Sequence, residues 1–234
     1  KEIDPRKLAA RPSISTNLDP ENPEKKHTAR RGATGLNEIY RWDEEQGIRH
    51  ITHDGHNDLG PDAHGDLTTW QKANSFPFGW EIMVHDETND ERYQVTTNFY
   101  YDMAPRAYGR QVVWYGWDGN DYEIYLWDAD SLKTIKITDN EYDDVSPVIY
   151  EDELAWEAYP GAEAEIYYWN KAVGKIQKLS NNLYEDDINP RIYNGNVVWQ
   201  GYDGDDYEIY LFDGSASTKL TSNDYDDIYP AIHG

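Results

Sequence analysis

The apolar residues of this chain come in runs of four or five, and each run is bounded by Asp-Gly, Asn-Gly or Pro. The sequence has no long stretch with the 3.6-residue spacing of an amphipathic helix. Short apolar runs between turn residues are typical of β-strands joined by tight turns. Polar and apolar residues do not alternate strictly within the runs, since Ile124 and Leu126 would lie on one face and Tyr125 and Trp127 on the other. The pattern predicts sheets that are covered on both faces.

A repeat of 40–44 residues organises most of the chain. A complete copy consists of Pro190-Arg-Ile-Tyr193, Val197-Val-Trp199, Glu208-Ile-Tyr210 and Lys219-Leu-Thr221. Prolines at one repeat position mark the start of the successive copies: Pro61, Pro105, Pro147, Pro190 and Pro230. Each copy reads as four short strands, which is typical of a β-propeller blade. We therefore predict an all-β fold, a five-bladed β-propeller of four-stranded antiparallel blades.

The two ends of the repeat region differ from its middle. We divide the chain into an N-terminal extension, 1–25, and a propeller, 26–234, with blades at roughly 26–60, 61–104, 105–146, 147–189 and 190–234. The first copy has Lys26-His-Thr-Ala-Arg30 where others have Val-Val-Trp, and it lacks a convincing first strand. Residues 230–234 form only the first strand of a sixth copy. We expect this C-terminal strand to complete the first blade and close the ring, which removes open sheet edges.

The repeat resembles the TolB-type (PD40, WD40-like) β-propeller repeat. The resemblance rests on the Val-Val-Trp strand and on the Asp-Gly-x-Asp-Tyr-Glu-Ile-Tyr turn and strand at 118–125 and 203–210, and it covers about residues 26–234. The sequence departs from the commoner form of that family, because Ile-Tyr-Asn-Gly at 192–195 replaces Ser-Pro-Asp-Gly. The resemblance implies the propeller fold and an exported bacterial protein that is a binding module or part of an enzyme.

The chain is strongly acidic, with 45 Asp and Glu against 21 Lys and Arg, and it has no cysteine. The missing cysteines exclude disulfides, thiolate metal sites and a cysteine nucleophile. The net charge of −24 disfavours a nucleic-acid partner, and no apolar run is long enough to predict a membrane span. Residues 1–31 hold 8 of the basic residues, so this arm is a candidate docking segment for the acidic body or for another protein.

The acidic residues gather in turns that share one face of a four-stranded meander. These are the turns between the second and third strands and the connections between blades. One aspartate precedes the marker proline by three residues in every copy: Asp58, Asp102, Asp144, Asp187 and Asp227. They either build turns by accepting backbone N–H bonds or bind Ca²⁺ near the channel mouth. The stretch 203–208, Asp-Gly-Asp-Asp-x-Glu, resembles a calcium loop only loosely, and a Gly-containing hairpin explains it equally well.

Two further sets recur at fixed repeat positions. A glutamate begins the third strand, where we expect it to tie blades together or cap a turn: Glu38, Glu81, Glu123, Glu165 and Glu208. A tyrosine lies in the connection between blades: Tyr100, Tyr142, Tyr184 and Tyr225. These tyrosines either wedge between blades or, with Trp80, Trp117 and Tyr202, bind a ligand such as a glycan.

The histidines concentrate in the first copy. His53 and His56, with Asp54 and Asp58 nearby, could bind a transition metal or supply a general base, and they are the only catalytic candidates that we single out. A solvated loop in a diverged repeat is the alternative. His64 and His233 occupy the repeat position of Tyr108, Tyr150 and Tyr193, where a structural role is expected.

Three functional hypotheses follow. The first is a non-catalytic, exported binding propeller whose acidic, aromatic-rich face engages a cation, a glycan or a basic protein. The second is a carbohydrate-active enzyme, a hydrolase or lyase, with its site near the His-rich first blade. The third is a subunit of a larger surface assembly that docks through residues 1–25.

Overall fold

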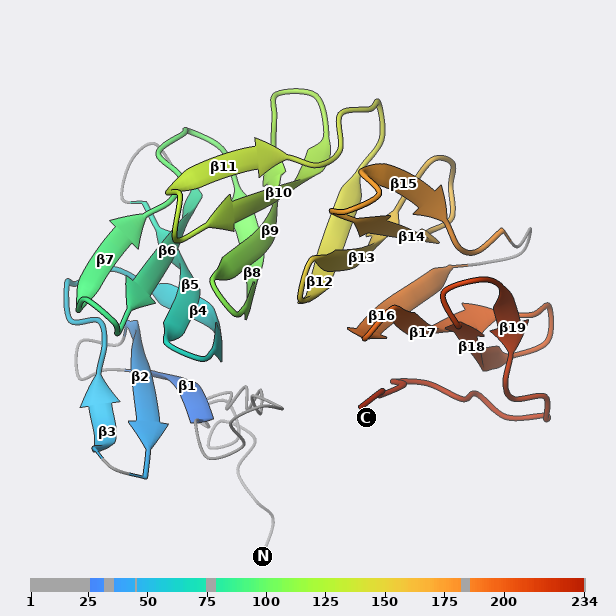
Figure 1. The fold of residues 1–234 in the computed structure, drawn as a ribbon, viewed down its shortest axis with the longest axis horizontal. Coiled ribbons are helices and arrows are strands. Elements are labelled where there is room, and N and C mark those ends of the chain that lie inside the picture. Colours follow the sequence, from blue (N-terminus) through green and yellow to red (C-terminus); the bar gives the residue numbers. More distant parts are fainter. Residues whose placement is uncertain (1–25, 32–35, 45, 75–78, 182–185, 234) are drawn as a thin grey trace, which may run out of the picture.

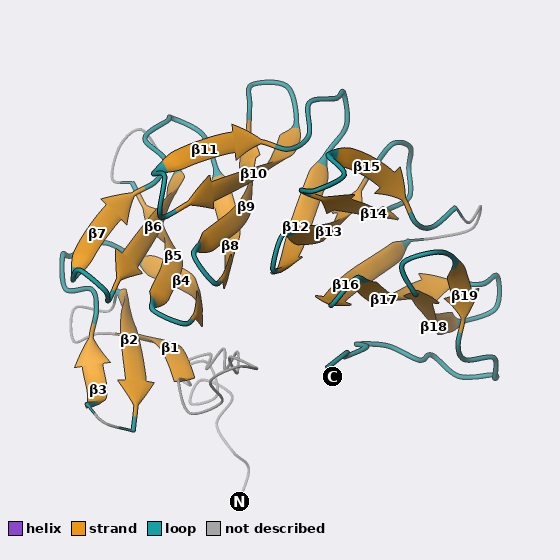
Figure 2. Cartoon of the chain, in the orientation of Figure 1, coloured by secondary structure: helices purple, strands orange, loops and turns teal. Residues whose placement is uncertain are grey.

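The computed structural model describes residues 26–31, 36–44, 46–74, 79–181 and 186–233, and this part of the chain contains strands but no helix (Figures 1 and 2). Nothing in it therefore qualifies as a long apolar helix that could cross a membrane. The strands form five antiparallel sheets, one for each copy of the repeat.

The sheets follow one another along the chain without exchange of strands. The first contains β1 (Lys26–Arg31), β2 (Asn37–Asp43) and β3 (Gly47–His50). The second contains β4 (Asp58–His64), β5 (Leu67–Ala73), β6 (Trp80–Asp86) and β7 (Glu91–Gln94). The third contains β8 (Asp102–Tyr108), β9 (Gln111–Trp117), β10 (Tyr122–Asp128) and β11 (Lys133–Lys136). The fourth contains β12 (Asp144–Tyr150), β13 (Glu153–Ala158), β14 (Glu165–Asn170) and β15 (Lys175–Lys178). The fifth contains β16 (Asp187–Tyr193), β17 (Asn196–Tyr202), β18 (Tyr207–Phe212) and β19 (Ser217–Lys219).

The five sheets are arranged in an arc around a common centre (Figure 1). Strands β8, β12 and β16 lie toward that centre, whereas β7, β11 and β15 lie at the outside. Each sheet faces its neighbours along the arc, as the blades of a propeller do. This arrangement confirms the predicted five-bladed β-propeller.

The hydrophobic core lies between the blades. Trp156 and Leu154 of the fourth sheet pack against Val113 and Ile124 of the third. An equivalent cluster joins the fourth and fifth sheets, and another joins the second and third. Because each middle sheet buries apolar side chains on both faces, its strands cannot show a polar face and an apolar face. This packing explains the lack of alternation in the sequence.

The marker prolines lie in a β-bulge of each innermost strand. In β8, Ala104 and Pro105 stand opposite the single residue Trp114, and the register shifts at the same position in β4, β12 and β16. The residue before the proline has a left-handed backbone in every copy: Gly60, Ala104, Ser146, Asn189 and Tyr229 have φ of 57°, 51°, 54°, 57° and 56°. Proline has no N–H to donate, so it suits the unpaired position of a bulge.

The closing strand expected at the C-terminus is not formed. Residues 220–233 carry no strand, and the first sheet has three strands. The segment nevertheless occupies the place of an innermost strand against the fifth blade. Tyr229 N–H donates to Gln200 Oε1 at 3.0 Å, just as Ala104 N–H donates to Gln71 Oε1, and the His233 ring stacks on Tyr193.

The partner strand β1 also differs from the second strand of the later blades. In the four later blades a tryptophan of the second strand binds the aspartate that begins the first strand, as described below. Strand β1 contains no tryptophan, and Asp227 keeps the bond from the asparagine four residues before it, Asn223, which is equivalent to the bond from Asn98 to Asp102.

Candidate functional site

The turns between second and third strands lie against the connections between blades, as the meander topology predicts. Tyr122 N–H donates to Asp143 Oδ1 at 3.0 Å, and Tyr207 N–H donates to Asp226 Oδ1 at 3.2 Å. In each pair the first residue follows a turn and the second belongs to the connection that leads to the next blade. These loops form one surface, which we call the acidic face: 118–122, 139–144, 160–164, 203–207 and 222–227.

Four of the five repeated aspartates are buried within the blades, Asp227 is half-buried, and the five do not gather around one ion. The indole N–H of the strand-two tryptophan donates to each of them in the four later blades: Trp70 to Asp58 at 2.9 Å, Trp114 to Asp102 at 3.0 Å, Trp156 to Asp144 at 2.6 Å and Trp199 to Asp187 at 3.1 Å. The five are not among the carboxylate groups of the described residues that lie close enough together to share an ion. Their observed role is structural, although the donor is an indole rather than the turn backbone.

Burial changes the acid–base behaviour of these aspartates. Loss of solvation raises the pKa of Asp58 and Asp102, and it raises the pKa of Asp144 and Asp187 to about 7. Carboxamide donors partly offset this effect, since Asn98 and Asn140 each donate to the second carboxylate oxygen of the nearest aspartate.

The strand-three glutamates cap the connection that follows their blade. Glu123 Oε1 accepts the Asn140 N–H at 2.8 Å, and Glu208 Oε1 accepts the Asn223 N–H at 2.8 Å. Glu165 accepts the Ser180 hydroxyl at 2.7 Å. These bonds support the turn-capping interpretation.

The aromatic candidates divide into two kinds. Tyr142 packs into the core between the third and fourth blades beside Tyr167, and burial raises the pKa of its phenol. Tyr100 and Tyr225 are 43% and 76% exposed. Tyr184 lies outside the described residues. The structure thus gives Tyr142 the wedging role and leaves Tyr100 and Tyr225 available to a ligand.

The three other aromatic candidates are half-buried beside the same loops. Trp117 and Tyr202 each form an edge-to-face contact with the tyrosine across the hairpin, at centroid distances of 5.2 and 5.5 Å. The backbone of Trp80 forms an isolated β-bridge with Tyr101 of the next connection. The Trp117 and Tyr202 rings therefore each pack on a tyrosine of their own hairpin.

The two histidines lie on an exposed loop and contact different groups. His56 Nδ1 is 3.2 Å from Asp54 Oδ1, and Asp54 also binds Lys72 Nζ at 2.6 Å. The His53 ring is tilted against His50, with 5.5 Å between centroids. Neither belongs to a group of three candidate metal ligands among the described residues. The geometry offers no support for a catalytic pair.

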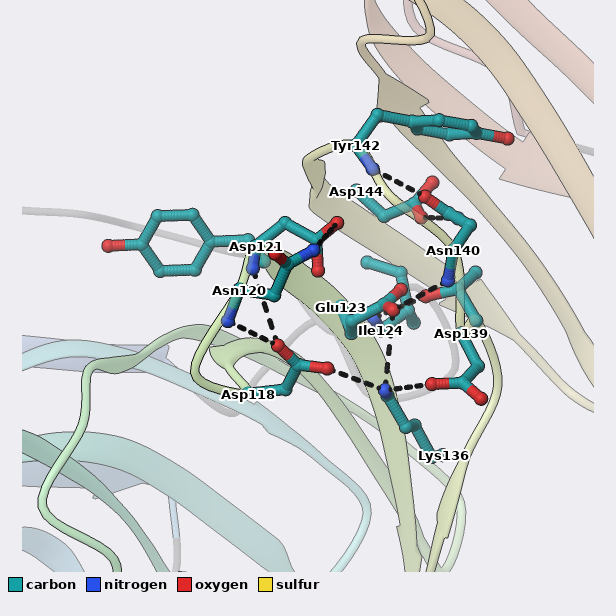
Figure 3. A network of polar contacts seen from close by, with 12 residues as sticks. Asp118, Asn120, Asp121, Glu123, Ile124, Lys136, Asp139, Asn140, Tyr142 and Asp144 are labelled. Atoms are coloured by element: carbon teal, nitrogen blue, oxygen red, sulfur yellow. Dashed lines mark hydrogen bonds and ion pairs between the residues drawn. The ribbon is translucent and has the colours of Figure 1, made fainter.

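Two carboxylate clusters lie on the acidic face, of which sequence reasoning had considered only the stretch 203–208, as a loose calcium loop. One consists of Asp118, Asp121 and Glu123 (Figure 3), and the other of Asp203, Asp206 and Glu208. In each cluster, one oxygen per residue lies within 4.8 Å of the others. The signal was present, because Asp-Gly-x-Asp-x-Glu occurs at 118–123 and at 203–208. At 203–208 the sequence left a loose calcium loop and a Gly-containing hairpin as alternatives.

The aspartate that opens each cluster does hold a turn. Asp118 Oδ1 accepts the N–H groups of Asn120 at 2.8 Å and Asp121 at 3.3 Å. Asp118 Oδ2 accepts from Lys136 Nζ at 2.8 Å, and the same ammonium contacts Asp139 and lies 3.3 Å from Glu123 Oε1. Figure 3 shows Lys136 between these carboxylates. Lys219 repeats the arrangement in the fifth blade, where it contacts Asp203 and lies 3.5 Å from Glu208 Oε1.

The innermost strands line a central cavity of about 340 Å³. Five aromatic rings, each in contact with the next, follow it from blade to blade: His64, Tyr108, Tyr150, Tyr193 and His233. Successive ring centroids are 4.0 to 5.6 Å apart, and each histidine stacks on its tyrosine neighbour, which supports the structural role expected from the repeat position.

Comparison with known proteins identifies the fold. No family model and no curated protein sequence matches the chain. Among solved structures, it is similar to TolB from Acinetobacter baumannii (14% identity, TM-score 0.59) over 91% of this chain and 56% of that one. It is similar to dipeptidyl peptidase 4 from Porphyromonas gingivalis (10%, TM-score 0.66) over 89% and 39%. A chain of the nidogen/laminin complex also matches (12%, TM-score 0.58), over 89% and 78%.

These likenesses support a TolB-like propeller fold. This chain spans little more than half of that TolB and less than half of that peptidase.

Proposed function

We propose that this chain is a non-catalytic binding propeller of an exported protein, and that its acidic face binds a basic segment of a protein partner. The observation that carries the proposal is an excess of exposed carboxylates on that face. Glu141, Glu163, Asp205 and Asp224 are exposed. Within the part of the chain that the structure describes, none of these four side chains forms an ion pair.

The cations of the acidic face are already engaged. Lys136 and Lys219 bind the two clusters, and Lys178 Nζ lies 2.9 Å from Glu165 Oε1. The remaining negative charge can therefore attract and orient a cationic partner.

Exposed aromatic rings beside these carboxylates favour lysine and arginine as the recognised groups. Tyr225 stands between Asp224 and Asp226 in the sequence and is the most exposed tyrosine of the face. A ring flanked by carboxylates can hold a cation through its π-face and through ion pairs together. A glycan remains the second candidate, because the same rings could stack on a sugar.

The test compares charge reversals on the two sides of the disc. The acidic-face variant is Glu141→Lys/Asp224→Lys, and the matched control is Glu44→Lys/Glu151→Lys, which makes the same change of net charge at exposed turns of the opposite side. Binding of a fluorescent ten-lysine peptide is followed by anisotropy at low and at physiological salt.

We expect the acidic-face variant to weaken binding at least tenfold and the control to change it less than about threefold, because exposed charges more than a Debye length away are screened. Equal losses in the two variants would show non-specific attraction and refute the proposal. Absence of peptide binding together with sugar binding that Tyr225→Ala abolishes would favour the glycan instead.

A further inference from the structure

We infer that the clusters Asp118–Asp121–Glu123 and Asp203–Asp206–Glu208 are two equivalent Ca²⁺ sites. The inference is independent of the basic partner proposed above, because it concerns the buried side of the same loops. It also differs from the site expected at the five repeated aspartates, which bind tryptophans.

The clusters contain buried carboxylate oxygens that have no donor. Asp121 is 4% exposed and Glu123 is 0% exposed, yet Asp121 Oδ1 and Glu123 Oε2 accept no hydrogen bond. The same atoms of the fifth blade, Asp206 Oδ1 and Glu208 Oε2, are likewise buried without a partner. Buried polar atoms of native proteins are nearly always satisfied, and an unpaired carboxylate oxygen is costly. A bound cation would satisfy both oxygens of each cluster.

The neighbouring lysine does not fill this role. Lys136 Nζ contacts Asp118 Oδ2 and Glu123 Oε1, which are not the two unpartnered atoms. Asp121 has one side-chain partner, because its Oδ2 accepts from Asn120 Nδ2 at 3.1 Å. Three carboxylates and one ammonium leave each cluster with an excess of negative charge.

The mutual repulsion of these groups points the same way. Burial raises the pKa of Asp121, and the charges of Glu123 and Asp118 raise it further. Burial and the charges of Glu208 and Asp203 do the same for the pKa of Asp206. Like charges that are held together become compatible when a cation lies among them.

The donor set selects the kind of cation. All three side chains offer carboxylate oxygens, and no histidine belongs to either cluster. Hard oxygen ligands favour Ca²⁺ or Mg²⁺ over zinc or copper. Ca²⁺ accepts irregular shells of 6–8 oxygens that include backbone carbonyls and water, whereas Mg²⁺ demands near-ideal octahedral geometry. A turn that supplies three clustered carboxylates suits Ca²⁺ better.

The protein contains an internal control. In the fourth blade the corresponding loop reads Pro160-Gly-Ala-Glu-Ala-Glu165, so a proline stands where Asp118 and Asp203 stand in the other two. Its Glu163 is exposed, and this loop does not form a cluster of three ligands. The proposal therefore predicts two sites in the described chain, and none in the fourth blade.

The experiment counts bound ions. The full chain, dialysed against EDTA, is titrated with Ca²⁺ in a calorimeter, and Tb³⁺ luminescence excited through Trp117 and Tyr122 provides an independent readout. We expect two ions per chain for the wild type, one for Asp121→Asn, one for Asp206→Asn and none for the double variant. Glu163→Gln should keep two.

Asn retains the size and one oxygen of Asp, and circular dichroism checks that each variant is folded. Wild-type protein that binds neither Ca²⁺ at millimolar concentration nor Tb³⁺ would overturn the inference. Two bound ions in a folded double variant would overturn it as well, because the ions would then lie elsewhere.

Discussion

The first blade and the four later blades pack against their neighbours through different side chains. In the later blades a buried tryptophan binds an aspartate and packs against the apolar residues of the neighbouring sheet. Between the first and second blades the apolar cluster is smaller, with Ile39, Ile51 and Trp70.

An ion-pair network extends that first interface. Arg41 is 0% exposed and occupies the repeat position of Leu126. Its guanidinium donates to Thr68 Oγ1 and to the Gly65 carbonyl, each at 2.7 Å, and lies 3.0 Å from Glu87. The comparison shows that a blade can diverge from its repeat when polar groups at the new interface are paired.

The largest expected effect comes from removing a core tryptophan of the later blades. Trp156→Ala should lower the free energy of unfolding by about 3–5 kcal/mol, because it leaves a large cavity and removes the donor of Asp144. Trp42→Ala in the first sheet should cost less, since Trp42 is only half-buried. Urea denaturation followed by circular dichroism measures both. Equal losses would show that stability depends no more on a tryptophan in the core between the later blades than on the half-buried Trp42 of the first sheet.

A smaller effect is expected from removing an ion pair between the first and second blades. Arg41→Leu should cost about 3 kcal/mol, because Glu87 loses a buried partner. The double variant Arg41→Leu/Glu87→Leu should recover part of that loss, while Arg92→Leu at an exposed position should change stability by less than about 0.5 kcal/mol. The same denaturation measurement applies. If the double variant lost more unfolding free energy than the two single variants together, the Arg41–Glu87 ion pair would not stabilise this interface.

The smallest effect concerns pH and sharpens the comparison among the aspartates. The pKa of Asp144 and Asp187 is about 7 in the folded protein, whereas an unfolded aspartate has a pKa near 3.9. The folded state therefore binds more protons between these values, and stability should fall as pH rises from about 4 to about 7 and then level off.

Between pH 5.5 and 7, Asp144 and Asp187 should each lower the free energy of unfolding by about 1–2 kcal/mol, because one pKa unit corresponds to about 1.4 kcal/mol. Asp144→Asn should remove its share, since the amide oxygen still accepts the Trp156 N–H. Asp213→Asn is the control, because side-chain and backbone donors lower the pKa of Asp213 to about 2, outside this window. Thermal melts across the pH range decide the matter, and an unchanged slope in Asp144→Asn would contradict the assignment.

The sequence allowed the fold to be predicted in detail, but the site only in part. The repeat of 40–44 residues indicated the blades, and the repeat position of His64 and His233 predicted a structural role, which their stacking on tyrosines supports. A structural role for the repeated aspartates was one of two alternatives, but their indole donors could not be predicted, because each donor lies 12 residues away on the paired strand. The closing strand was expected from the sequence of the C-terminal segment, but residues 220–233 form no strand and the first sheet has three strands.

The sequence by itself determined the number of blades, their strand order and the negative charge of the acidic face. These properties follow from local turn chemistry and from a repeated pattern of apolar residues, both of which are encoded within one copy. Only the tertiary structure decided which carboxylates are buried and which oxygens lack a donor. Those properties depend on neighbouring strands and blades. Asp121 lies beside other carboxylates, whereas Asp144 accepts a hydrogen bond from an indole, although both aspartates lie between the third and fourth blades.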